Sequence, residues 1–94
     1  MEFEIKNGNG KIKEYDNYNG VLKFEGEYLF GQRNGKGKEY DRNGRIIFEG
    51  EYLKGKRNGK GKEYDNENGE LEFEGEYLNG KKWNGKGFKI KNIN

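Results

Sequence analysis

The chain has 94 residues, of which 29% are hydrophobic and 38% are charged, with 19 basic residues nearly balanced by 17 acidic ones. So few apolar side chains can fill only a thin core, yet an aromatic content of 15% is too high for a disordered tail. The absence of Cys, His, Ser and Thr excludes disulfides, thiolate or imidazole metal sites and acyl-enzyme triads. A net charge of +2 excludes a global attraction to nucleic acid.

The sequence carries no targeting signal that we recognise. The segment from Met1 to Ile5 lacks the apolar stretch of a signal peptide, and no apolar run approaches the ~18 residues of a membrane-spanning helix. No change in composition indicates a linker. We therefore expect a single domain in the cytoplasm, with peripheral attachment to a membrane as an open alternative.

Internal repeats are the strongest signal in the sequence. The hexapeptide Phe-Glu-Gly-Glu-Tyr-Leu begins at Phe24, at Phe48 and at Phe73. A second block, Asn-Gly-Lys-Gly-Lys-Glu-Tyr-Asp, begins at Asn34 and at Asn58. Repetition at a period of 24 or 25 residues is typical of a repeat protein in which each unit is one small supersecondary element.

The repeats predict an all-β fold. Within the first hexapeptide, apolar residues and glycine alternate with charged residues, which is the periodicity of a strand, and Gly or Asn interrupts every segment before three helical turns could form. Each unit is predicted as a strand, a long glycine-rich turn, a second strand and a short Asn-Gly turn. Joined in series, these units make an elongated antiparallel β-meander. In chain order, the predicted strands cover residues 2–5, 11–15, 21–29, 36–40, 45–53, 60–64, 70–78 and 86–91.

The domain is predicted to consist of three repeats between two caps. The repeats cover about residues 21–44, 45–69 and 70–87. The caps cover about residues 1–20 and 88–94, where the sequence departs from the repeat consensus.

The sequence does not fix the register of each hairpin. If Gly35 and Gly37 lie opposite Phe24 and Tyr28, the rings can cover bare backbone. The lysines that flank these glycines would then meet the glutamates of the neighbouring strand on the other face. This register sends Tyr40 to the charged face unless a bulge at the glycines returns it to the aromatic face, and we favour the bulge.

The repeated blocks carry a family resemblance. Glu-Gly-Glu-Tyr-Leu, a Gly two residues on, and then Asn-Gly-Lys-Gly together resemble the MORN repeat, particularly its bacterial and protist variant. The resemblance covers nearly the whole chain. It implies an elongated, twisted sheet of β-hairpins. It also implies a function among those of the family, which includes assembly scaffolds, modules attached to enzymes, phospholipid binders and bacterial antitoxins.

Other motifs give weaker signals. The segment from Gly55 to Lys60 has the wrong spacing for a phosphate-binding loop and does not precede a helix. The acidic residues before Gly69 are out of step with an EF-hand loop. Carboxylate pairs such as Glu25 with Glu27 recur in every unit, whereas a catalytic site needs one unique constellation. We therefore expect no enzyme activity and no cofactor, and a ladder of Glu and Lys on the exposed sheet face.

Two surfaces remain as candidate sites. The first is an exposed groove of aromatic side chains and glycine that receives a protein partner or a second copy of the chain: Phe24, Tyr28, Tyr40, Phe48, Tyr52, Tyr64, Phe73, Tyr77 and Trp83. The second is a basic edge along the long turns that binds anionic lipid: Arg33, Lys36, Lys54, Lys56, Arg57, Lys60, Lys81 and Lys82.

The sequence thus predicts a non-catalytic scaffold for protein–protein interaction or self-assembly. Binding to anionic phospholipid and antitoxin-like inhibition of a protein toxin are the alternatives, and nucleic acid is not expected as a partner. Trp83, placed in the last long turn by a one-residue insertion, is either an interface anchor or a cover for the end of the sheet.

Overall fold

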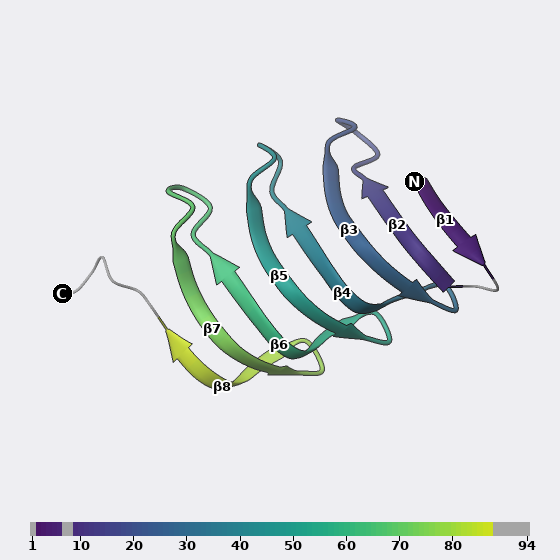
Figure 1. Cartoon of the computed structure of the whole chain (residues 1–94). Helices are drawn as coiled ribbons and strands as arrows, with labels where there is room; N and C mark the ends of the chain where they lie inside the picture. Colours follow the sequence, from purple (N-terminus) through teal and green to yellow (C-terminus); the bar gives the residue numbers. More distant parts are fainter. Residues whose placement is uncertain (1, 7–8, 88–94) are drawn as a thin grey trace.

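The computed structural model describes residues 2–6 and 9–87, and over these residues it is one antiparallel sheet with its strands in sequence order (Figure 1). The predicted all-β meander is therefore confirmed. No helix in the described part of the chain is long and apolar enough to cross a bilayer. The strands are β1 (Glu2–Lys6), β2 (Asn9–Tyr15), β3 (Leu22–Leu29), β4 (Gln32–Tyr40), β5 (Ile46–Leu53), β6 (Lys56–Tyr64), β7 (Leu71–Leu78) and β8 (Lys81–Gly87).

The hairpin turns differ from the prediction. Strands β4 and β6 each begin four residues earlier than expected, so the segment assigned to a long glycine-rich turn belongs mostly to a strand. Only two residues connect β3 to β4, Phe30 and Gly31, with φ angles of 49° and 81°. Positive φ at both central residues is the conformation of a type I′ turn, whose twist matches that of the flanking strands.

The segments Asn19-Gly20, Asn43-Gly44 and Asn68-Gly69 lie in the longer connections between hairpins. In the loop between β4 and β5, the Asp41 carboxylate accepts hydrogen bonds from the backbone N–H groups of Asn43 and Arg45, at 2.8 and 3.0 Å. Gly44 closes the loop at a φ of 83°. Asp16 and Asp65 make the same kind of bond in the two equivalent loops, which explains why an Asp follows Tyr15, Tyr40 and Tyr64.

The structure fixes the register within a repeat, and Gly35 and Gly37 do not lie opposite Phe24 and Tyr28 in it. Gly26 lies opposite Gly37, and Tyr28 lies opposite Arg33, so β4 holds two more residues than β3 between these pairs. A bulge is therefore present, but an even number of extra residues leaves the alternation of faces unchanged. The expected return of Tyr40 to the aromatic face is accordingly wrong.

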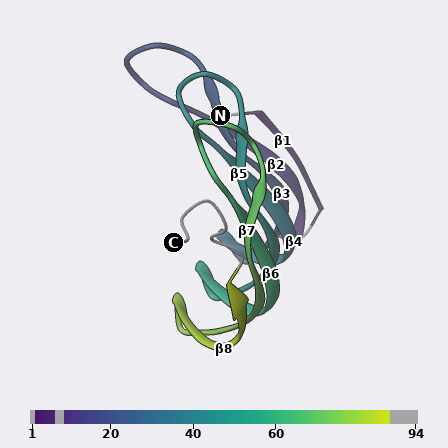
Figure 2. The same cartoon turned by 90° about the vertical axis from the view of Figure 1, so that its left-hand side faces the viewer.

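The sheet is elongated and bowed. Its Cα atoms extend over 49 × 30 × 14 Å, whereas a flat pleated sheet would be only a few ångströms thick. Figure 2 shows the same curvature from the side, with the strands bent rather than straight. The bow gives the single sheet an inner and an outer surface, and these two surfaces have different chemistry.

The last hairpin departs from the others. Trp83 lies within β8 instead of in a long turn, as the extra residue of a bulge between the pairs Tyr77–Lys82 and Glu76–Asn84. The predicted strand over residues 86–91 overlaps β8 only at its start. The rest of that strand and the predicted cap at 88–94 lie outside the described residues.

Candidate functional site

One face of the sheet, here called the aromatic face, holds the core. Its rings belong to Phe24, Tyr28, Phe48, Tyr52, Phe73 and Tyr77. All except the partly buried Tyr28 are at most 8% exposed. Successive rings meet edge to face, with centroids 5.2–5.6 Å apart, in the order Phe24, Tyr52, Phe48, Tyr77 and Phe73. These six members of the expected binding groove therefore pack against one another instead of forming an open surface.

The rings pack against glycine because any larger residue would collide with them. A Cβ atom on Gly37 would lie 2.6 Å from the ring of Phe24, and one on Gly61 would lie 2.7 Å from the ring of Phe48. The glycines thus leave their space on the aromatic face to the rings. On the opposite face they leave bare backbone.

Arginine side chains cover the outside of the aromatic core. The guanidinium of Arg33 lies 4.1 Å from the centre of the Phe24 ring, and that of Arg57 lies 4.0 Å from the centre of the Phe48 ring. Lys82 takes the same position over Phe73 at 4.7 Å. These cation–π contacts shield the rings from water and engage three of the cations that were expected to form the lipid-binding edge.

Each arginine is also paired with a glutamate. Arg33 donates two hydrogen bonds of 2.9 Å to Glu14, and Arg57 donates bonds of 3.1 and 3.0 Å to Glu39. The Tyr52 hydroxyl donates to Glu39 at 2.5 Å. Burial alone would raise the pKa of Glu39, but the hydrogen bonds from Arg57 and Tyr52 outweigh it and hold the pKa below its usual value. The carboxylates of the aromatic face are therefore bound within the fold.

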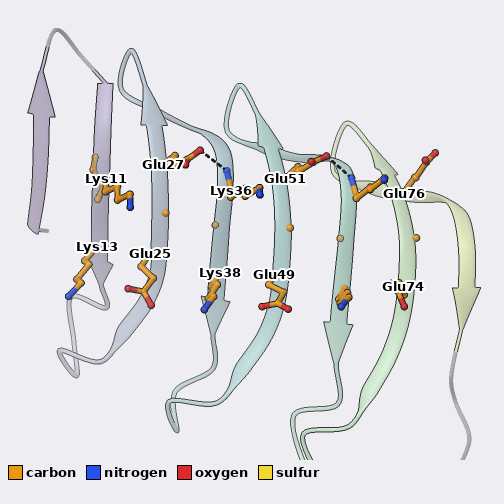
Figure 3. A pocket seen from close by; sticks show the side chains of 18 residues that line it. Lys11, Lys13, Glu25, Glu27, Lys36, Lys38, Glu49, Glu51, Glu74 and Glu76 are labelled. Carbon is orange, nitrogen blue, oxygen red and sulfur yellow. Dashed lines mark hydrogen bonds between the residues drawn. The ribbon is translucent and has the colours of Figure 1, made fainter.

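The opposite face is hollowed into a groove of about 1440 Å³, seen from close by in Figure 3. We call it the charged groove. It runs across strands β2 to β7, and its floor is the backbone of Ile12 and five glycines. Its walls are two rows of charged side chains, which comprise Lys13, Glu25, Lys38, Glu49, Lys62 and Glu74 in one row and Lys11, Glu27, Lys36, Glu51, Lys60 and Glu76 in the other.

The sign of the charge alternates from strand to strand along both rows. Lys38 of β4, for example, lies opposite Glu25 of β3 and Glu49 of β5. The predicted Glu and Lys ladder is thus confirmed in the described strands. No ion pair within 4.0 Å joins two of these groove side chains, whereas the aromatic face has five such pairs among the described residues. Four of the six groove glutamates each accept one hydrogen bond within the fold, Glu27 and Glu51 from the backbone N–H groups of Lys36 and Lys60, and Glu25 and Glu49 from tyrosine hydroxyls. The lysine ammonium groups and the second oxygen of each of these carboxylates are available to a ligand.

The two expected groove residues Tyr40 and Tyr64 lie on this charged side. The Tyr40 hydroxyl donates to Glu25 at 2.6 Å and the Tyr64 hydroxyl donates to Glu49 at 2.9 Å. Burial and the neighbouring carboxylate raise the pKa of each tyrosine from 10 to about 12. Trp83, the ninth expected residue, is 62% exposed in β8. The nine predicted groove residues therefore do not form one surface.

The predicted basic edge is divided as well. Arg33, Arg57 and Lys82 cover the aromatic face, whereas Lys36 and Lys60 belong to the charged groove. The three remaining lysines are exposed at the tight turns and the strand ends beside them, namely Lys54, Lys56 and Lys81.

The sequence signal for the charged groove is a Gly flanked by two residues of the same charge, Glu in one strand and Lys in the next. The segment Glu25-Gly26-Glu27 pairs with Lys36-Gly37-Lys38, and the same pattern recurs in the second repeat, whereas the third repeat has Asn84-Gly85-Lys86 in place of the Lys-Gly-Lys segment. We expected a ladder from this pattern but did not assign a site to it, because sequence does not reveal that the sheet bends around the glycines.

The comparisons with known proteins agree with this geometry. A family model described as MORN repeat matches residues 24–44, 48–69 and 73–88, which together exceed half of the chain. The chain belongs to the MORN-repeat family. No curated protein and no solved structure matches it. MORN repeats are generally modules that interact with proteins or membranes.

Proposed function

We propose that this MORN-repeat chain is a non-catalytic scaffold that binds a protein partner in the charged groove. The observation that supports this proposal is the continuous hollow across six strands, lined by twelve charged side chains that form no ion pair with one another within 4.0 Å. Fully satisfied charges, such as Arg33 with Glu14, lie on the aromatic face. A face that contributes little to the core is the one that can bind a partner without unfolding the sheet.

The carboxylates of the groove favour binding over catalysis. Glu49 and Glu51 recur in β3 and β7 as equivalent pairs, so no strand holds a unique acid and base. Glycosidase pairs need two carboxyl groups whose environments give them different protonation states. The repeated pairs of this groove stand in equivalent positions, which fits a repetitive ligand surface.

Partner capture by matched variants tests the groove. The double variant Lys36→Glu/Lys38→Glu reverses the charge of one groove strand, and the control Lys54→Glu/Lys56→Glu makes the same net change at a tight turn. Proteins captured from the source cell by the wild type and by the control, but lost by the groove variant, would support the proposal. Identical capture by all three proteins would contradict it. Far-UV circular dichroism verifies that each variant folds.

Binding to an anionic lipid surface is the second candidate. It is favoured by exposed apolar side chains at the tight-turn edge, where Phe30 is 77% exposed and Leu53 is 47% exposed. Lys54 and Lys56 lie beside them. Such an edge could place apolar side chains among lipid head groups, with each nearby cation contributing ~1 kcal/mol.

Co-sedimentation with vesicles distinguishes the two candidates. If the turn edge binds lipid, vesicles rich in phosphatidylserine should recruit the wild type at low salt and lose it as salt rises. The variant Lys54→Glu/Lys56→Glu should lose this recruitment and the groove variant should keep it. Absence of recruitment at low salt would eliminate the lipid candidate.

A further inference from the structure

The charge pattern of the groove limits what it can bind. Six lysines and six glutamates give it no net charge, and both groove residues of a strand have the same sign. The strands therefore form alternating bands, basic on β2, β4 and β6 and acidic on β3, β5 and β7. A polyanion would meet as many repulsive bands as attractive ones. A complementary ligand must itself alternate between acidic and basic groups.

The spacing of the bands favours a helix over an extended peptide. Neighbouring strands lie ~4.8 Å apart, so the charge changes sign at that interval along the groove. An α-helix brings a new turn every ~5.4 Å, whereas an extended peptide directs side chains to one side only every ~6.8 Å. Over the five intervals from β2 to β7, the turns of a helix fall out of step with the charged bands by a total of ~3 Å, which flexible Lys and Glu side chains can accommodate. The side chains of an extended peptide fall out of step by ~10 Å, which equals the spacing of two bands.

The shape of the groove also fits a helix. Its length from β2 to β7 is ~24 Å, which corresponds to a helix of ~16 residues. The groove volume of about 1440 Å³ over this length gives a mean cross-section of roughly 60 Å², comparable with a slim helix ~10 Å wide. The floor at Gly37, Gly50 and Gly61 is bare backbone, so a helix with small side chains on one side can approach it closely.

We propose that the charged groove binds one α-helix of a partner protein, laid across strands β2 to β7. This helix alternates acidic and basic residues from one turn to the next and directs small side chains to the glycine floor. The inference rests on the proposed function and specifies its partner. The heptad Lys-Ala-Glu-Ala-Glu-Ala-Lys has this pattern, because its Glu pair flanks the central Ala and its Lys pair, formed with the next heptad, flanks the same side of the helix one turn later.

A synthetic helix provides the direct test. A fluorescein-labelled peptide of three such heptads is titrated with the full chain at low ionic strength, and binding is followed by fluorescence anisotropy. A block peptide of the same composition, with all Glu in one half and all Lys in the other, is the matched control. We expect the alternating peptide to bind at least about tenfold more tightly than the block peptide. Equal affinities would overturn the inference.

Helical conformation is tested separately. Proline replaces the central Ala of the alternating peptide, which breaks the helix but keeps every charge. We expect this peptide to bind at least about tenfold more weakly than its parent. Equal binding would show that the groove reads an extended or flexible chain, and the inference of a helix would be wrong.

Charge reversal and rescue locate the binding site. The variant Lys36→Glu/Lys38→Glu turns the basic band of β4 acidic, so it should bind the alternating peptide at least about tenfold more weakly than the wild type. A peptide in which both Glu of the middle heptad are Lys should restore the affinity to within about threefold. The control Lys54→Glu/Lys56→Glu should bind the original peptide as the wild type does. Failure of the rescue would place the peptide elsewhere.

The two proposals fail in different ways. If no helical peptide binds, yet cellular proteins are still lost on reversal of Lys36 and Lys38, the groove binds a partner of another shape and only the helix inference falls. If the peptides bind but the cellular proteins do not depend on the groove, the proposed function falls.

Discussion

The two faces of this sheet use the same residue types for different purposes. On the aromatic face, Glu39 accepts hydrogen bonds from Arg57 and Tyr52, and four-fifths of its side chain is buried. In the charged groove, Glu74 is exposed and lies opposite Lys62 with no ion pair within 4.0 Å. A glutamate on the aromatic face of this sheet is thus held by charged partners, whereas a glutamate in the groove keeps at least one carboxylate oxygen for a ligand. Strand alternation alone decides which role it has.

The largest expected effect on stability comes from removing an aromatic ring of the core. The variant Phe48→Ala should lower the free energy of unfolding by ~3–5 kcal/mol, because Phe48 is fully buried between two tyrosines and beneath Arg57. Lys38→Ala, on the groove face, should change it by less than ~0.5 kcal/mol. Urea unfolding followed by circular dichroism measures both values. Similar losses from the two variants would contradict the division between the faces.

A glycine of the groove floor gives the next largest effect. In Gly50→Ala the new Cβ atom would lie 2.5 Å from the backbone oxygen of Lys60 and 2.8 Å from the Phe48 ring. We expect a loss of ~1–3 kcal/mol from this overpacking. The control is Gly55→Asn, because Gly55 has open space around it and Asn tolerates its φ of 85°. Thermal unfolding should separate the two variants clearly; a neutral Gly50→Ala would mean that the rings do not lie on the glycine backbone.

A glutamate swap compares the faces at a smaller scale. Glu39→Gln keeps the shape of the side chain but removes the charge that Arg57 faces, so stability should fall by ~1–2 kcal/mol. Glu74→Gln, its counterpart in the groove, should stay within ~0.5 kcal/mol of the wild type. Urea midpoints at neutral pH provide the comparison, and equal stability of the two variants would argue against the arginine ladder.

Tyrosines on both faces should stabilise the folded protein over a similar pH range. Burial and a glutamate partner raise the pKa of Tyr28, Tyr40 and Tyr64 from 10 to about 12. Because the folded pKa is the higher one, their stabilisation is complete below pH ~10 and is lost as pH rises through ~12. Absorbance at 295 nm should show these phenols protonated near pH 11 in the folded protein. Complete ionisation there, with the sheet intact by circular dichroism, would refute the hydrogen bonds.

The sequence predicted the repeats, the strands and the charge ladder because each depends on local periodicity. It made the hairpin turns too long because Phe30 and Lys54 adopt positive φ, which is uncommon for residues other than glycine, while the nearby Asn-Gly pairs gave a stronger turn signal. The predicted turns over residues 30–35 and 54–59 therefore contain the true turn residues only at their start. The Asn-Gly pairs of the second block lie instead in the bulges of β4 and β6.

The candidate sites were predicted less well for a related reason. Assigning Arg33 and Arg57 to a turn placed them at an edge, although in a strand they share the alternation of Gly37 and Gly61 and so point to the rings. The aromatic side chains were predicted to be exposed because a single sheet offers no second layer to bury them. Neither the guanidinium cover nor the bend of the sheet has a local sequence signature.

Backbone amide chemical shifts test the central claim most directly, since they report which face of the folded chain a partner touches. When the alternating helical peptide is added to ¹⁵N-labelled protein, we predict the largest shift changes along the groove floor and its walls, at Gly37, Gly50 and Gly61 and their Lys and Glu neighbours. The tight turns, such as Lys54 and Gly55, should change little. Changes concentrated at the tight turns and absent from the groove glycines would contradict the account.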